Sequence, residues 1–271
     1  MDPGALRDAL TVVVGVLTGV LSGLFGVGGA VISTPGIRLL GASAALAVGT
    51  TLPSIFPGAA SGVIRYRRQD LIDWRAVAAT APAGVVAAAA GGVTAHHVPG
   101  NGHVLMFLTA ALLGWSGTRM MRAARADVPP AAESDSEAAA DEEPTGPVRH
   151  PPGRSALVGV MAGFLSGLLG VGGGIVMVPL FTQWLGMHVK QAIGSSLACV
   201  SVFAVSGTIT HALEHGIDWR FGLLLAVGTI PGAQLGAALA IRADDRRLRL
   251  AVGAFLVLTS VLYAAEELAS L

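Results

Sequence analysis

"SGLFGVGGAVISTP", at residues 22–35, recurs as "SGLLGVGGGIVMVP" at residues 166–179. Both strings are apolar, contain a Gly-Val-Gly-Gly cluster and end in proline. The paired positions of this motif are Gly26 and Gly170, Gly28 and Gly172, Gly29 and Gly173, and Pro35 and Pro179. Two copies that align without a gap indicate an internal duplication.

The duplication extends well beyond these strings. Thr50 and Thr51 correspond to Ser195 and Ser196, and the Asp-Trp-Arg tripeptide at residues 73–75 recurs at residues 218–220. The repeat is far longer than a solenoid unit, so the sequence predicts two homologous transmembrane halves, residues 1–122 and 155–271.

The segment between the halves, residues 123–154, holds seven acidic residues and several prolines. This composition predicts a disordered, extended linker. A docking tail for a basic partner is the alternative reading of its acidic run.

The composition indicates a membrane protein. The chain has 271 residues, 53% hydrophobic and 13% charged, with a mean hydropathy of +0.68, whereas soluble domains carry about 25% charged residues. The apolar stretches comprise residues 11–36, 42–64, 76–95, 104–118, 155–186, 191–210, 221–241 and 250–265. A bilayer core needs about 20 apolar residues in helical form. The predicted fold is therefore an all-α polytopic membrane protein with about eight hydrophobic segments, four in each half.

The clustered glycines predict a broken helix in each half. Each glycine costs about 1 kcal/mol relative to alanine inside a helix, and three fall within residues 26–29. Non-helical backbone persists inside a bilayer only where protein encloses it or where it lines a polar cavity. Amide groups at the start of the next half-helix carry the positive end of the helix dipole, which attracts anions. The breaks therefore predict a cavity for a negatively charged solute.

A second set of glycines favours close helix packing instead. These glycines recur every four residues, which is the small-residue packing pattern of membrane helices. They are Gly15, Gly19, Gly23, Gly159, Gly163 and Gly167.

The paired hydroxyl residues Thr50, Thr51, Ser195 and Ser196 allow two interpretations. Each pair follows a glycine near the start of the second segment of its half. Their hydroxyls could contact oxygens of a ligand, or could bond to the backbone of their own or a neighbouring helix. The sequence leaves both open.

The distribution of arginines gives conflicting orientations. Basic residues in the loop after the second segment predict that this loop, and with it the N-terminus, lies in the cytoplasm. In the second half the bias reverses, because the basic residues follow the seventh segment instead of the sixth. Four full crossings per half predict parallel halves, whereas the charges favour inverted halves. A re-entrant element in each half would remove the conflict.

The two "GVGG" strings with their prolines, the "GTT" and "GSS" triplets and the Asp-Trp-Arg turns resemble the sulfite exporter TauE/SafE family, also called 4-toluene sulfonate uptake permeases. The resemblance covers nearly the whole chain apart from the linker. It implies a secondary transporter in the bacterial inner membrane that carries sulfite, organosulfonates or related anions. From the duplicated halves we expect alternating access, in which the two halves rock around a central anion site. Its motif positions imply substrate binding at Gly26, Gly28, Gly29, Pro35, Gly170, Gly172, Gly173 and Pro179.

The expected partners are a small anionic solute and the lipid bilayer, with homo-oligomerisation as a further expectation. Balanced charge, 17 acidic and 17 basic residues, and the lack of a recognisable motif argue against nucleic-acid binding. No cofactor is expected, because a dinucleotide fingerprint requires a soluble strand before its glycines.

Other classes of function remain as alternatives. A cavity with broken helices could be an anion channel, and the chain could be a membrane scaffold that transports nothing. An intramembrane hydrolase could use Ser195 and His211, and "HALEH" at residues 211–215 fits a zinc-protease pattern. Neither pattern includes a third positioned group, so the sequence favours a transporter over an enzyme.

Overall fold

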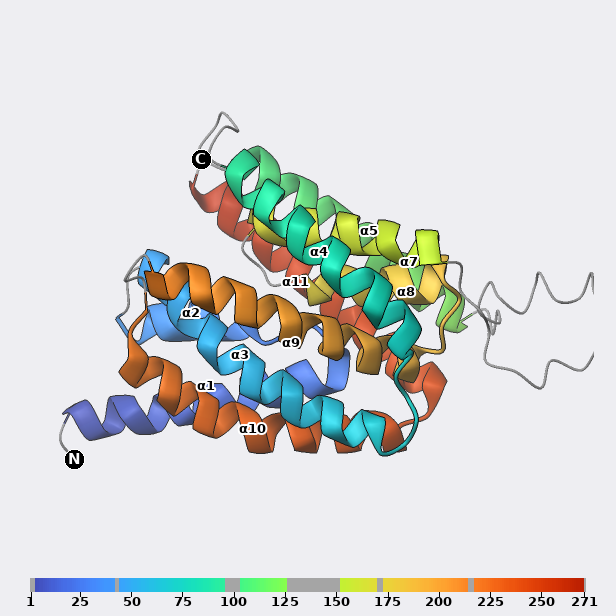
Figure 1. The fold of residues 1–271 in the computed structure, drawn as a ribbon. Helices are drawn as coiled ribbons and strands as arrows, with labels where there is room; N and C mark the ends of the chain where they lie inside the picture. Colours follow the sequence, from blue (N-terminus) through green and yellow to red (C-terminus); the bar gives the residue numbers. More distant parts are fainter. Residues whose placement is uncertain are drawn as a thin grey trace, which may run out of the picture.

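The computed structural model describes residues 3–41, 44–95, 103–125, 152–169, 173–213 and 217–270. Their secondary structure is helical throughout (Figure 1). The first half contains α1 (Pro3–Phe25), α2 (Ala30–Leu39), α3 (Ala44–Arg67), α4 (Trp74–Ala95) and α5 (His103–Arg125). The second half contains α7 (Pro152–Leu169), α8 (Gly174–Trp184), α9 (Val189–Leu213), α10 (Trp219–Arg242) and α11 (Asp245–Ser270). Most of the predicted linker, residues 126–151, lies outside the described ranges.

The first glycine cluster separates α1 from α2. Gly26 and Gly28 have φ angles of 71° and 77°, a left-handed conformation that glycine adopts without steric cost. The chain then reverses, because Gly29 packs against Thr18 and Gly36 packs against Val14 of α1. Residues 11–36, expected as one segment, therefore form a helix hairpin whose second arm is short.

The second half has the same order of elements. Its first helix, α7, ends at Leu169, and the short helix α8 begins at Gly174. Gly173 precedes α8 with a φ angle of 63°. Gly170 and Gly172 lie outside the described residues.

The first helix of each half packs against a helix of the other half, through faces lined by glycine. Along α1, Gly15, Gly19 and Gly23 pack successively on the α10 backbone at Leu225, Thr229 and Ala233, so the two helices are parallel. Gly159 and Gly163 of α7 meet Thr80 and Gly84 of α4 in the same way. The packing interpretation is confirmed for these five glycines, and the surroundings of Gly167 are not described.

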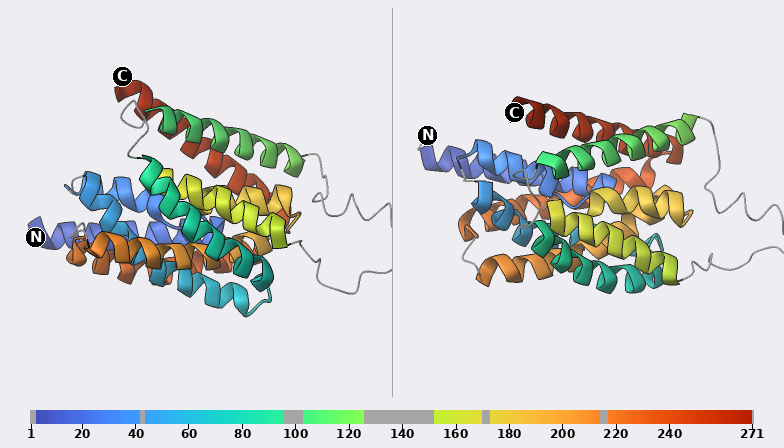
Figure 2. Two further views of the ribbon diagram at one scale, coloured as in Figure 1. Left: turned by 45° about the horizontal axis from the view of Figure 1, so that its top comes forward. Right: turned by 90° about the horizontal axis from the view of Figure 1, so that it is seen from above.

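The two halves are inverted with respect to each other. The corresponding helices α5 and α11 run antiparallel, since Gly114 meets Ser260 and Gly117 meets Gly253. The corresponding helices α3 and α9 are also antiparallel, with Leu52 at Gly207 and Tyr66 at Gly194. Figure 2 shows that both chain termini lie at one end of the helix bundle. We call this the terminal end.

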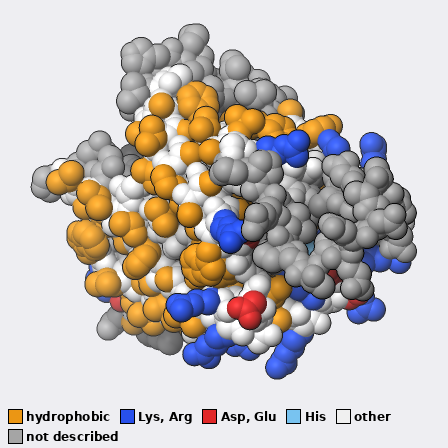
Figure 3. All heavy atoms as spheres, turned by 45° about the vertical axis from the view of Figure 1, so that its right-hand side comes forward, with side chains coloured by type: hydrophobic (Ala, Val, Ile, Leu, Met, Phe, Trp, Pro, Cys, Tyr) orange, Lys and Arg blue, Asp and Glu red, His pale blue; other side chains and the backbone are white. Residues whose placement is uncertain are grey.

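The opposite end collects the basic residues, and we call it the basic end. Four contacts assemble it: Ser195 with Asp73, Lys190 with Asp245, Arg246 with the Ala124 carbonyl, and Thr80 with the Ser155 carbonyl. Figure 3 shows Lys and Arg side chains gathered beside a lateral face of hydrophobic side chains. The helix ends that meet here carry Arg65, Arg67, Arg68, Arg75, Arg122, Arg125, Arg154, Lys190, Arg242, Arg246, Arg247 and Arg249.

The structure corrects the prediction that the N-terminus lies on the same side as the first arginine-rich loop. Asp8 near the N-terminus binds Arg220 at the start of α10, which is the terminal end. The arginines of α3 follow Tyr66, at the basic end. The prediction counted a full crossing for residues 11–36, but the α1–α2 hairpin returns toward its starting side. The same reversal brings the arginines of both halves to one end.

The outer faces of the helices suit a lipid environment. Three helical segments are long and apolar enough to cross a membrane, namely Gly4–Phe25, Val189–Ile209 and Trp219–Arg242. Trp74 and Trp219 are about half exposed and begin α4 and α10 at opposite ends of the bundle. Tryptophan is enriched at membrane–water interfaces, so this pair is typical of the two edges of a membrane-embedded region.

Candidate functional site

The two helix breaks meet in the interior of the bundle. Gly174, the first residue of α8, lies directly against the backbone of Gly26 and Val27. A Cβ atom on Gly174 would fall 2.5 Å from the Val27 carbonyl oxygen, so no other residue fits without rearrangement. The N-terminus of α8 therefore faces the segment that leads into α2.

Helix α9 supports the first break along one face. Ser196 donates a 2.7 Å hydrogen bond to the Gly26 carbonyl oxygen, which could not continue helix bonding because the chain turns there. Gly26 also contacts Ile193, and a Cβ on Gly28 would lie 2.6 Å from Val200. The break of the first half is thus held by a helix of the second half.

The first break presents backbone donors without partners. Over the described ranges, the amide N–H groups of Gly28 and Gly29 donate no hydrogen bond, while those of Ala30 and Ser33 bond to Gly28 and Gly29 carbonyls. Unpaired amides at a helix start, together with the helix dipole, favour an anion.

The structure gives Thr50 and Ser195 symmetric partners in the opposite half. The Asp218 amide donates to Thr50 Oγ1 at 2.9 Å, and the Asp73 amide donates to Ser195 Oγ at 3.0 Å. Each hydroxyl therefore holds the residue that precedes the third long helix of the other half, α10 or α4. The backbone-bonding interpretation fits these two residues.

The two aspartates complete these junctions as helix N-caps. Asp218 Oδ1 accepts from the amides of Arg220 and Phe221, and Asp73 Oδ1 accepts from those of Arg75 and Ala76. In the sequence, the Asp-Trp-Arg turns were recognised as a repeat and as part of the family resemblance, but not as helix N-caps. An aspartate immediately before an apolar helical run was the N-cap signal that could have assigned them.

The remaining predicted positions lie in or near the hairpins. Thr51 is buried, and its hydroxyl lies 3.5 Å from that of Thr34 in α2. Pro35 lies within α2, and buried Pro179 lies within α8. Proline lacks an amide hydrogen, so each short helix misses an internal hydrogen bond one turn after it begins.

Thr18 is the residue of this region that the sequence analysis did not identify. It belongs to α1, is 1% exposed and packs against Gly29. Its hydroxyl has no hydrogen-bond partner among the described residues. The counterpart of Thr18 in the repeat is Ala162, so a search for positions shared by both halves could not find it.

The described residues provide no metal-binding cluster for the zinc-enzyme alternative. No group of three or more His, Cys, Asp or Glu among the described residues could hold a metal ion. Residues 214–216 and the side chain of His211, which make up most of "HALEH", lie outside the described residues.

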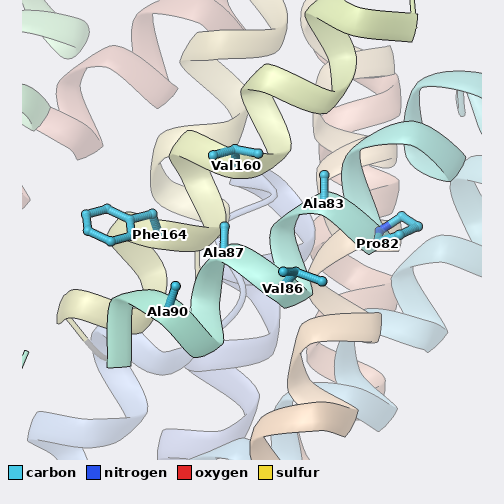
Figure 4. A pocket seen from close by; sticks show the side chains of 7 residues that line it. All are labelled: Pro82, Ala83, Val86, Ala87, Ala90, Val160 and Phe164. Atoms are coloured by element: carbon cyan, nitrogen blue, oxygen red, sulfur yellow. The ribbon is translucent and has the colours of Figure 1, made fainter. Parts of the chain in front are cut away.

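A groove on the outside of the bundle has the wrong chemistry for an anion. It lies between α4 and α7 and is lined by apolar side chains, among them Val86, Val160 and Phe164 (Figure 4). Val86 is 73% exposed, which is expected for a surface in contact with lipid tails.

Comparison with known proteins identifies the family. The sulfite exporter TauE/SafE family matches residues 11–263, a range that begins within α1, ends within α11 and contains both glycine motifs. The chain belongs to this family. No solved structure matches it significantly.

Several relatives in the TauE/SafE family are described as probable membrane transporter proteins. One from Xylella fastidiosa strain 9a5c is 28% identical and covers 86% of this chain and 85% of its own. YjnA from Bacillus subtilis is 24% identical, covering 92% of this chain and 97% of its own. MJ0441 from Methanocaldococcus jannaschii is 24% identical over 91% of each chain. The TauE/SafE chain described here is thus a multi-pass membrane protein of a transporter family.

Proposed function

We propose that this protein is a secondary transporter of small anions of the sulfite and organosulfonate class. The observation that carries the proposal is the contact between the start of α8 at Gly174 and the break at Gly26 and Val27. Two half-helices from inverted halves begin at one buried place, so the positive ends of their dipoles act on the same solute.

The chemistry of the interior supports a weakly held anion. The buried polar side chains of the described residues are neutral: besides Cys199 and Tyr66, whose hydroxyl donates to the Gly23 carbonyl, they are serine or threonine. Charge compensation therefore comes from backbone dipoles and amide N–H groups instead of a buried cation. A carrier must release its solute on the far side, and such neutral donors favour reversible binding.

The symmetric junctions support alternating access around this place. Thr50–Asp218 lies at the terminal end and Ser195–Asp73 lies at the basic end, and both hydrogen bonds are formed. In the proposed cycle, the arrangement with both ends tied is assigned to the closed conformation. Rocking of the inverted halves would open one end at a time.

The arginine distribution supports an orientation in the membrane. Positively charged loops remain in the cytoplasm, so the basic end faces the cytoplasm and both termini face outward. The proposed location is the bacterial inner membrane.

Transport by the purified protein in proteoliposomes tests the proposal. Uptake of sulfite, sulfoacetate and taurine is measured with and without a pH gradient, with protein-free liposomes as the control. Saturable uptake with counterflow is the expected result. Unsaturable flux would indicate a channel, and no flux of any of these solutes would contradict the proposal.

A further inference from the structure

The Thr18 hydroxyl departs from the way this fold treats other buried hydroxyls. Within α1, Thr11 donates to the Arg7 carbonyl four residues earlier. Thr182 and Thr208 make the same bond within their helices. Thr18 makes no such bond, and its oxygen is buried without a partner among the described residues. An unpaired buried hydroxyl costs stability, so it calls for a physical reason.

The repeat shows that the fold does not require this hydroxyl. Thr18 corresponds to Ala162, which is fully buried in α7. In the second half, the helix before the break therefore folds with a side chain at this position that has no polar atom. The hydroxyl belongs to the first half alone.

Thr18 lies next to the first helix break. Its side chain packs against Gly29, the residue before α2. The amides of Gly28 and Gly29 have no hydrogen-bond partner in the described chain. The atom of Thr18 nearest Gly29 is the methyl carbon Cγ2. The unpaired hydroxyl therefore belongs to a side chain that packs on the residue before α2, where the dipole of α2 has its positive end.

We propose that Thr18 Oγ1 donates a hydrogen bond to an oxygen of the transported anion and makes the first break its primary oxyanion half-site. This inference rests on the proposed transport function. It predicts preference for a ligand that offers several oxygens on one atom, such as sulfite or a sulfonate head, over a halide. The second break, with Ala162 in place of Thr18, contributes its helix dipole without a side-chain donor.

The decisive variant is Thr18→Val, which keeps the shape and removes the hydroxyl. Binding of sulfite, methanesulfonate and bromide is measured on purified full-length protein, together with the melting temperature without added anion. We expect the Kd for sulfite and methanesulfonate to rise at least tenfold, the loss of one hydrogen bond to a charged acceptor, with bromide changed less. The ligand-free melting temperature should stay the same or rise, because an unpaired hydroxyl is removed.

Two further variants separate binding from folding. Thr18→Ser keeps the hydroxyl and should bind sulfite within a few-fold of the wild type. Thr11→Val removes a partnered hydroxyl from the same helix and should leave the Kd unchanged.

Unchanged sulfite binding in Thr18→Val, with transport by the wild type intact, would overturn this inference alone. A lower ligand-free melting temperature in Thr18→Val would also overturn it, because the hydroxyl would then have a structural partner such as a buried water. Failure of the wild type to bind or transport any oxyanion would reject the proposed function and this inference with it.

Discussion

Gly28 shows at the scale of one residue why the motif uses glycine. Its φ angle of 77° is unfavourable for a residue with a Cβ by about 1–2 kcal/mol. A Cβ there would also lie 2.6 Å from Val200 of α9. Both the backbone conformation and the contact with the opposite half exclude a side chain.

Gly28→Leu should therefore abolish anion flux while the protein still inserts into the membrane. The side chain would push α9 away from the first break and displace the unpaired amides of Gly28 and Gly29, where we propose that the solute binds. The measurement is sulfite uptake in proteoliposomes at matched protein content. Gly153→Leu is the control, because Gly153 is exposed with open space around its Cα. Wild-type flux in Gly28→Leu would exclude this glycine from the transport site.

Sequence alone could locate the breaks and the hydroxyl pairs but not the state of each hydroxyl. Glycine clusters are local signals, since each glycine weakens a helix wherever it stands. Whether Thr50 faces a solute or the Asp218 amide depends on a helix far away in the sequence. Thr18 could not be identified from the sequence for a different reason. What distinguishes it is that its buried hydroxyl has no hydrogen-bond partner among the described residues, and only a structure shows this.

At the scale of helices, two hydrogen-bonded junctions connect the first half to the second. Thr50 ties α3 to the start of α10, and Ser195 ties α9 to the start of α4. Because the halves are inverted, equivalent bonds lie at opposite ends of the bundle. Losing one bond should favour opening at that end only.

Thr50→Val and Ser195→Ala should each lower the free energy of unfolding by about 1 kcal/mol, because an aspartate amide loses its acceptor. This corresponds to a decrease in Tm of about 2–4 °C. The conservative variants Thr50→Ser and Ser195→Thr should restore most of the loss. Thermal unfolding in detergent measures both effects.

The same two variants should shift accessibility in opposite directions. A cysteine reporter near the meeting point of the breaks, in a Cys199→Ala background, is labelled by a membrane-impermeant reagent in right-side-out and inverted vesicles. Thr50→Val should increase labelling from the terminal end, and Ser195→Ala from the basic end. Equal changes from both sides would argue against end-specific opening.

At the element scale the sequence predicted the apolar segments but not the direction of the chain after each break. Hydropathy shows that the stretch without charged residues continues to residue 36. It does not show whether the helix continues in the same direction or the chain turns back. The return of α2 along α1 is set by the contacts of Gly29 with Thr18 and of Gly36 with Val14. Those contacts decide the orientation of every later helix in that half.

The inverted arrangement gives the whole molecule a definite topology. Both termini lie at the terminal end, and the linker leaves α5 at Arg125 and rejoins α7 at Pro152, both at the basic end. If the basic end faces the cytoplasm, as proposed above from the arginine distribution, both termini must face outward.

Reporter fusions at three places test this topology. Alkaline phosphatase, which is active only outside the cytoplasm, should be active at either terminus and inactive within the linker. A fluorescent protein that folds only in the cytoplasm should give the reverse pattern. Active phosphatase in the linker would invert the assignment, and opposite results at the two termini would contradict the arrangement of the helices.

The exchange of helices between halves also constrains how the protein is made. The face of α1 with Gly15, Gly19 and Gly23 has its partner in α10, which the ribosome produces only near the end of synthesis. During translation this narrow face must stay unmatched in the bilayer while most of the chain is still being inserted. The first half therefore cannot reach its final packing as an independent unit. Biogenesis depends on retaining an early helix in a loose state until a late one arrives.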